Sequence, residues 1–288
     1  MTSNVSIWDD KIHIIYVVEL VFYSGLLCST VGALLRGRHR PKAFYLTALS
    51  VLKIAGLAIS LDAAVKSVNA TNNDKLSDMP SLGLVTTGAI LISIATTPLL
   101  YVTQAFCFPE DLFKAIPRAA IAPRLMVLLP AILSIVGYDY WSTKGSHSTT
   151  GLTLVRASSI IFLATYLIFL LVGAVSSFKS RRNCDTSRDL GVMIVLLACP
   201  FFLVRFVYTI LSAFELSTDT SAYHKFNTFN GDWRLYLGMF VVMEFMVELI
   251  YVIGLHLIIS RDRTNSSHQR GDVDTVMESI PEASKIDA

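Results

Sequence analysis

Charge is scarce in this chain. Only 16% of its 288 residues are Asp, Glu, Lys or Arg, whereas an ordinary soluble domain carries about 25%. The charged residues form short clusters, and between them lie seven apolar runs, each of about 18 residues or more, the length that crosses a hydrocarbon core of ~30 Å. This pattern excludes a soluble enzyme, a nucleic-acid binder and a disordered chain. The sequence predicts a multi-pass membrane protein in contact with the lipid bilayer.

Cysteine and nucleotide-binding motifs are equally sparse. The four cysteines show neither metal-ligand spacing nor the framework of a disulfide-rich secreted domain; they are Cys28, Cys107, Cys184 and Cys199. The glycine patterns of Walker and Rossmann loops are absent, so nucleotide-driven transport and redox chemistry are not expected. Asp9 and Asp10 stand where a signal peptide would have positive charge, which predicts a retained first helix.

The apolar runs predict an all-α bundle of seven transmembrane helices over residues 1–259. The helices are expected near 12–35, 43–64, 82–106, 118–136, 152–178, 190–212 and 233–259. The fourth of these is the shortest and contains Pro130, which a spanning helix tolerates when neighbours satisfy the freed carbonyl. Residues 260–288 are polar and predict a disordered cytosolic tail. The sequence shows no internal repeat, so it gives no support to an inverted-repeat transporter.

The distribution of Lys and Arg predicts the orientation. These residues concentrate in the first, third and fifth connecting segments and at the start of the tail. Because cytoplasmic loops carry the excess of positive charge, the N-terminus should be lumenal or exterior and the C-terminus cytosolic. The sequons at Asn4 and Asn69 then lie on the lumenal side, where glycosylation occurs. We expect a protein of the endoplasmic reticulum membrane.

Ionisable residues at bilayer depth are the strongest indication of a site, because such groups are costly there and usually functional. They are Glu19, Lys53, Asp62, Arg156, Arg205, Glu244 and Glu248. With a rise of about 1.5 Å per residue, Glu19 and Arg205 lie roughly 10 Å below the lumenal surface and Glu244 roughly 16 Å. Similar depth on three helices predicts one polar chamber that opens toward the lumenal half of the bundle.

Glu244 and Glu248 are four residues apart and share one helical face. Two carboxylates so close in a medium of low dielectric resist ionising together, so one is expected to keep its proton at neutral pH. Arg205 stays charged and needs an anionic partner. One glutamate could fill that need while the other acts as a general acid. The alternative is a set of buried ion pairs that only join helices.

Aromatic residues accompany these charges; Phe202 and Tyr208 lie within one turn of Arg205. Aromatic faces stabilise cations by about 0.5–2 kcal/mol, so a chamber with an acid and aromatic walls suits carbocation chemistry. Packing and interface anchoring are the alternative roles. Receptor motifs are absent, since no D-R-Y ends the third helix and no N-P-x-x-Y occurs in the seventh. The seventh helix also has no lysine for retinal, and the chain has no D-D-x-x-D or D-x-D-D motif.

Two segments resemble a known family, residues 200–208 (PFFLVRFVY) and 238–251 (GMFVVMEFMVELIY). They are similar to a fungal family of small seven-pass membrane proteins, which includes terpene cyclases of meroterpenoid pathways of the ascofuranone, ascochlorin and macrophorin type. The resemblance implies a cyclase of secondary metabolism, of isomerase or lyase type, that acts on a farnesylated aromatic or polyketide, often after terminal epoxidation. An enzyme acid would protonate the epoxide or alkene, and a final proton loss would end the reaction. No metal or cofactor is implied, and the other enzymes of such a pathway are possible partners.

The residue assignments combine both sources. Arg205 and the two glutamates of the last helix stand in the resembling segments, whereas the remaining residues rest on depth alone. The candidate catalytic acids are Glu244, Glu248 and Glu19. The candidate residues for positioning a prenylated substrate are Arg205, Lys53, Tyr208, Arg156 and Asp62. A lipid or drug translocator and a receptor-like sensor remain as alternatives to the cyclase.

Overall fold

The computed structural model describes residues 11–36, 40–72, 82–108, 121–142, 148–180, 186–215, 225–226 and 232–278. Within these segments the chain is helical and has no strand, which confirms the all-α fold class. The helices are α1 (Lys11–Leu35), α2 (Arg40–Asn72), α3 (Leu82–Ile94), α4 (Thr96–Cys107), α6 (Ile121–Ser142), α7 (Ser148–Ser180), α8 (Thr186–Glu215), α9 (Trp233–Leu235), the π-helix η5 (Tyr236–Val242) and α10 (Met243–Glu278).

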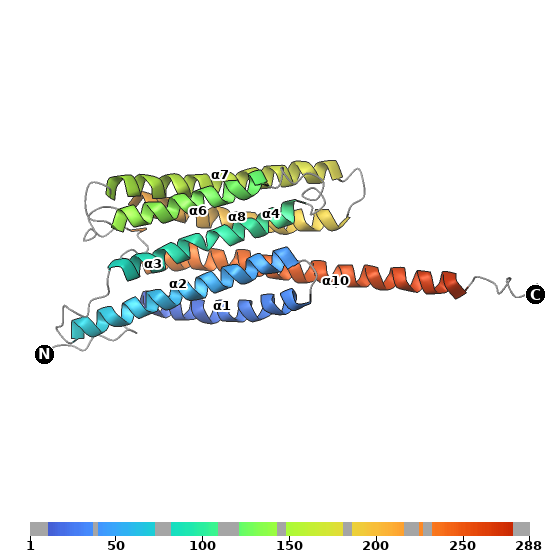
Figure 1. The fold of residues 1–288 in the computed structure, drawn as a ribbon, viewed down its shortest axis with the longest axis horizontal. Helices are drawn as coiled ribbons and strands as arrows, with labels where there is room; N and C mark the ends of the chain where they lie inside the picture. Colours follow the sequence, from blue (N-terminus) through green and yellow to red (C-terminus); the bar gives the residue numbers. More distant parts are fainter. Residues whose placement is uncertain are drawn as a thin grey trace, which may run out of the picture.

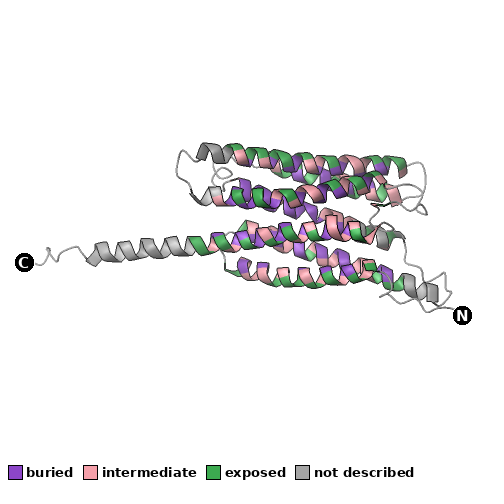
Figure 2. Ribbon diagram, turned by 180° about the vertical axis from the view of Figure 1, so that it is seen from behind, coloured by how far each residue is buried: buried purple, intermediate pink, exposed green. Residues whose placement is uncertain are grey.

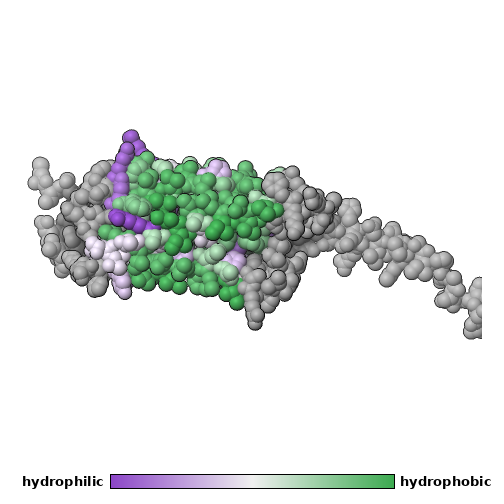
Figure 3. All heavy atoms as spheres, turned by 90° about the horizontal axis from the view of Figure 1, so that it is seen from above, coloured by the Kyte–Doolittle hydropathy of each residue, from purple (hydrophilic) through white to green (hydrophobic). Residues whose placement is uncertain are grey.

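The outer surface of the bundle is apolar. Large side chains such as Val21, Leu171 and Leu197 are 69%, 66% and 63% exposed, and Figure 3 shows a broad, mostly hydrophobic surface on the face in view. Seven helical spans in the described residues are long and apolar enough to cross a membrane. Because a soluble monomer rarely exposes so large an apolar surface, this is the surface of a multi-pass membrane protein.

The central helix of the bundle is α4. Figure 1 places α3 and α4 between one group formed by α1, α2 and α10 and another formed by α6, α7 and α8. Helix α4 contacts α2, α6, α7 and α8, and 67% of its span is buried, the largest share of the seven. Figure 2 shows buried residues where helices meet and exposed residues on the outer faces. Helix α4 is therefore the most interior part of the described bundle.

The third span is broken at Ala95, where the sequence predicts one helix over 82–106. The break separates α3, which ends at Ile94, from α4, which begins at Thr96. Pro98 has no N–H group, so the carbonyl of Ile94 loses the donor that a continuous helix would supply. The break sets the position of Thr96, which contributes to the site described below.

Pro130 lies inside α6 without ending it. It cannot donate to the carbonyl of Met126, four residues earlier, and the hydroxyl of Thr165 in α7 donates to that oxygen at 3.3 Å. A neighbouring helix thus satisfies the freed carbonyl, as expected in a membrane. The same two helices meet closely at Gly137 and Gly151, where a Cβ on Gly151 would lie 2.7 Å from the Gly137 carbonyl oxygen. Small residues allow this approach.

The last span differs from the prediction at both ends. It begins with α9 and the π-helix η5, and only then continues as α10. Helix α10 continues to Glu278, where the sequence predicts a disordered tail from residue 260. Residues 260–278 include no proline, which would remove a backbone donor and interrupt the helix. The next proline in the sequence is Pro281. Residues 279–288 lie outside the described part of the chain.

Candidate functional site

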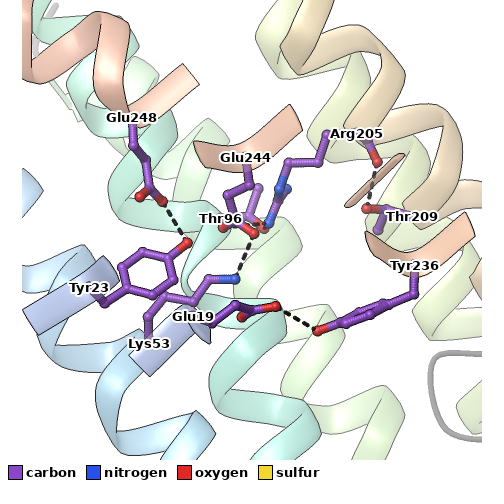
Figure 4. Close-up of polar contacts among 9 residues, drawn as sticks. All are labelled: Glu19, Tyr23, Lys53, Thr96, Arg205, Thr209, Tyr236, Glu244 and Glu248. Carbon is purple, nitrogen blue, oxygen red and sulfur yellow. Dashed lines mark hydrogen bonds and ion pairs between the residues drawn. The ribbon is translucent and has the colours of Figure 1, made fainter. Parts of the chain in front are cut away.

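Five of the seven ionisable residues predicted at bilayer depth lie together in the interior (Figure 4). They come from four helices, and we call them the charge cluster: Glu19 of α1, Lys53 of α2, Arg205 of α8, and Glu244 and Glu248 of α10. Each is at most 1% exposed. Charges this far from water require close partners, so their contacts decide what the cluster can do.

Glu244 is the centre of the cluster. Its Oε2 accepts a hydrogen bond from Nζ of Lys53 at 2.6 Å, and its Oε1 accepts one from Nη2 of Arg205 at 3.1 Å. Nη2 of Arg205 also donates to Oγ1 of Thr96 at 3.0 Å. These charge-assisted bonds join α2, α8 and α10, and the helix break before Thr96 brings α4 to the same point.

Glu248 and Glu19 have no ion-pair partner among the described residues. The hydroxyl of Tyr23 donates to Oε1 of Glu248 at 3.0 Å, and the hydroxyl of Tyr236 donates to Oε1 of Glu19 at 3.3 Å. The second carboxyl oxygen of each glutamate is buried without a hydrogen-bond partner in the described residues. The two glutamates that share a face of α10 therefore differ in kind, since only Glu244 is ion-paired.

The cluster contains two cations and three carboxyl groups. When Glu244 is ionised between Lys53 and Arg205, one further negative charge makes the cluster neutral, and Glu19 or Glu248 supplies it. A third ionised carboxylate would leave an excess charge in the low-dielectric interior, which is strongly unfavourable. Charge balance thus favours one protonated carboxyl group in the cluster.

Aromatic rings cover both cations. Nζ of Lys53 lies 4.9 Å from the centroid of the Phe240 ring and 5.5 Å from that of Tyr23. Cζ of Arg205 lies 4.8 Å from the same Phe240 centroid. Phe240 belongs to η5, and π-helical turns frequently occur at functional sites. The sequence contains no pattern from which this π-helix could be predicted.

A pocket opens beside the cluster and encloses about 830 Å³ of empty space, its open mouth included. Hydroxyl groups surround it, from Ser60, Ser93, Thr96, Ser134, Ser158, Ser159, Thr209 and Ser212. Aromatic rings complete the wall, from Tyr16, Tyr138, Phe162, Phe206, Tyr208 and Phe240. Of the charge cluster, Arg205 alone lines the pocket, so the carboxyl groups are not part of its wall. Sequence reasoning missed the serines because each is unremarkable in its own helix.

Two other predicted residues, Tyr208 and Arg156, do not join the cluster. Tyr208 lines the pocket, and its ring centroid is 5.7 Å from that of Phe240. Arg156 donates from Nε to the carbonyl of Ala213 at 3.2 Å and from Nη2 to the carbonyl of Phe214 at 3.1 Å. These carbonyls belong to the last turn of α8, so Arg156 satisfies the end of that helix, as basic side chains commonly do.

The remaining predicted residues lie elsewhere. Asp62 is half exposed and forms an ion pair with Lys66, one turn away on α2, at 2.7 Å. The structure therefore does not bring it to the cluster. Asn4 lies outside the described residues, and Asn69 lies in α2 with its side chain outside the description. No group of three or more His, Cys, Asp and Glu in the described residues could hold a metal ion.

The fold and the site define a seven-helix membrane protein with a buried charge cluster beside a hydroxyl-lined pocket. The model of a family described as a domain of unknown function, DUF7702, matches residues 10–259. The match extends over all seven spans, and the chain belongs to this family. No curated protein and no solved structure matches the chain.

Proposed function

We propose that this protein is a membrane-bound terpene cyclase, of fungal secondary metabolism, that cyclises a farnesylated meroterpenoid precursor. The observation that carries the proposal is Glu248, a carboxyl group 0% exposed and held by the Tyr23 hydroxyl at 3.0 Å, with no cation bound to it in the described residues. Charge balance in the cluster favours one protonated carboxyl group, and we assign Glu248 as the group that donates this proton to the substrate. We place the protein in the endoplasmic reticulum membrane, and the distribution of Lys and Arg supports a lumenal N-terminus there.

In the proposed reaction Glu248 donates its proton to the terminal epoxide oxygen or alkene carbon of the substrate. The π electrons of the next double bond then form a carbon–carbon bond to the cationic centre, and each ring closure moves the positive charge along the chain. In the last step a carbon of the final cation returns a proton to the Glu248 carboxylate, so the acid is regenerated and the product has the mass of the substrate. The aromatic wall of the pocket supports this chemistry because ring faces stabilise cations.

The substrate must reach the carboxyl side of the cluster for this reaction to occur. The pocket includes Arg205 and Phe240 but none of the three carboxyl groups. Phe240 therefore stands at the boundary between the pocket and the acid. We assign the π-helix η5, which carries Phe240, as the element that moves to admit the polyene chain.

Microsomes from a host without such pathways test the proposal. Farnesylated phenols with and without the terminal epoxide are supplied, and mass spectrometry detects a cyclised isomer. We expect product from the natural chain and none from Glu248→Gln at equal protein level. Asp232→Asn is the matched acid-to-amide control, since Asp232 caps α9 through the N–H of Arg234 and Asn caps a helix equally well. Full turnover by Glu248→Gln would remove Glu248 from the acid role.

The separation of pocket and acid favours a second candidate, a translocator of lipids or drugs. A pocket lined by hydroxyl groups and one guanidinium binds a polar head group without needing a proton donor. This function predicts that a fluorescent lipid or drug moves across proteoliposomes that contain the protein. If the protein moves the probe across the bilayer and forms no cyclised product, the translocator is the better account of its function.

A further inference from the structure

Arg205 has hydrogen-bond donors for which the described residues supply no acceptor. Its side chain is 1% exposed, and Nη2 is engaged by Glu244 and Thr96. Nε and Nη1 are buried without a partner in the described residues. A guanidinium group stays charged and carries five N–H donors in total. Arg205 lines the pocket, and buried donors without acceptors are rare. Its unpaired N–H groups therefore indicate an acceptor that the described residues do not supply.

Hydroxyl groups beside Arg205 also have hydrogens to donate. Thr96 accepts from Arg205, so its own hydroxyl hydrogen is uncommitted in the described contacts. Ser93 and Ser134 share one hydrogen bond at 3.1 Å, which uses one of their two hydroxyl hydrogens and leaves the other. By contrast, the hydroxyl of Ser60 donates to the carbonyl of Gly56 at 2.9 Å. The free donors therefore lie on α4, on α8 and on either α3 or α6, which all meet at this pocket.

We propose that this pocket binds an anionic oxygen group, such as a carboxylate or phenolate, at the head of a lipophilic molecule. Arg205 is the anchor, Thr96 is a further donor, and the pair of Ser93 and Ser134 supplies one more from the hydroxyl that their mutual hydrogen bond leaves free. Phe162 and Phe206, which also line the pocket, contact the apolar part of the ligand. The charge cluster accommodates the anion. With Glu244 ionised and both Glu19 and Glu248 protonated the cluster carries one net positive charge, and the bound anion neutralises it.

This inference deepens the proposed function. It rests on that function only for the chemical class of the substrate. A carboxylated or phenolic aromatic head would occupy the pocket, and its prenyl chain would extend past Phe240 toward the carboxyl groups. An anionic membrane lipid has the same chemistry at its head. Binding without turnover separates this proposal from the cyclase proposal, because the pocket can bind the head group even if no ring is formed.

Isothermal titration calorimetry on the full chain in neutral detergent micelles tests the site. The probes are a farnesylated dihydroxybenzoate and its methyl ester, which differ in the charge of one oxygen group. We expect the acid to bind at least about tenfold more tightly than the ester, as for hydrogen bonds to a charged group. The double variant Ser93→Ala/Ser134→Ala should weaken binding of the acid about tenfold. The control is Ser50→Ala, at a buried serine whose hydroxyl donates to the Leu46 carbonyl of its own helix.

Arg205→Lys keeps the positive charge and reduces the number of donors, so we expect weaker binding of the acid with some preference over the ester retained. Equal affinity of acid and ester for the natural chain would overturn the proposal, and so would equal losses in the double variant and Ser50→Ala. A third titration adds phosphatidic acid to the micelles as competitor. Competition that disappears in the double variant supports the site with a lipid as its anion, whereas competition unchanged by the variants shows that phosphatidic acid binds elsewhere.

Discussion

The ion pair between Lys53 and Glu244 should dominate the stability of the polar interior. Nζ and Oε2 are 2.6 Å apart, which at an effective dielectric constant of about 20 corresponds to an attraction of ~6 kcal/mol before desolvation. Removal of one buried partner commonly costs about 3–5 kcal/mol. Because Glu19 and Glu248 can exchange a proton to restore neutrality, we place each single change at the lower end of that range. Lys53→Met and Glu244→Gln should each lower the free energy of unfolding by about 3 kcal/mol.

The double variant Lys53→Met/Glu244→Gln removes both charges and leaves neither unpaired. It should cost at least about 2 kcal/mol less than the sum of the two single changes. The free energies are measured by reversible unfolding in mixed micelles of increasing dodecyl sulfate content, followed by tryptophan fluorescence. Ser50→Ala serves again as the control for a buried polar deletion. Additivity within about 0.5 kcal/mol would refute the coupling of Lys53 to Glu244 and with it the assigned centre of the cluster.

Three further predictions concern the packing, the acid and the proton balance. Gly151→Ala puts a Cβ 2.5 Å from the backbone nitrogen of Trp141, so α6 and α7 must separate and unfolding should become easier by about 1–3 kcal/mol. The control is Gly25→Ala, whose Cβ meets nothing within 4 Å and which should stabilise α1 by up to about 1 kcal/mol. Equal changes in the free energy of unfolding of the two variants would contradict the close approach of α6 and α7. Glu248→Gln should abolish cyclised product yet change the free energy of unfolding by no more than about 1 kcal/mol, because the amide oxygen still accepts a hydrogen bond. Binding of the farnesylated dihydroxybenzoate should take up about one proton, as Glu19 or Glu248 becomes neutral when the anion pairs with Arg205. Calorimetry in buffers of different ionisation enthalpy measures that uptake, and a buffer-independent binding heat would contradict the charge balance.

The sequence was sufficient for the spans and for most of the cluster. Long apolar runs have only one stable arrangement in a bilayer, a helix that satisfies its own backbone, and depth follows from the helical rise. Glu19, Arg205 and Glu244 were therefore expected at a common level, and the structure brings them together with Lys53. Asp62 shows the limit of depth alone, since it pairs with Lys66 on an exposed face.

The pocket and the irregular helices could not be predicted in the same way. The pocket depends on how α3, α4, α6, α7 and α8 are rotated about their axes, and an apolar run with scattered serines does not determine that rotation. The π-helix η5 carries no residue pattern that distinguishes it from a regular helix. Pro98 did offer a signal for the break at Ala95, because proline removes a donor from the preceding turn. Beyond residue 259 two signals conflict. The polar composition indicates disorder, whereas the absence of proline permits the helix to continue.

The order of synthesis delays completion of the polar interior. Lys53 and Glu244 are 191 residues apart, in the second and the last spans. At about 5–20 residues per second the ribosome needs roughly 10–40 s to make the chain between them. During that interval Lys53 is without its final partner, in a position where an inserted lysine costs about 2.5–3.5 kcal/mol at the centre of a helix. A nascent chain truncated before its seventh span would carry this cation unmatched, and membrane assembly is completed only when the last helix arrives.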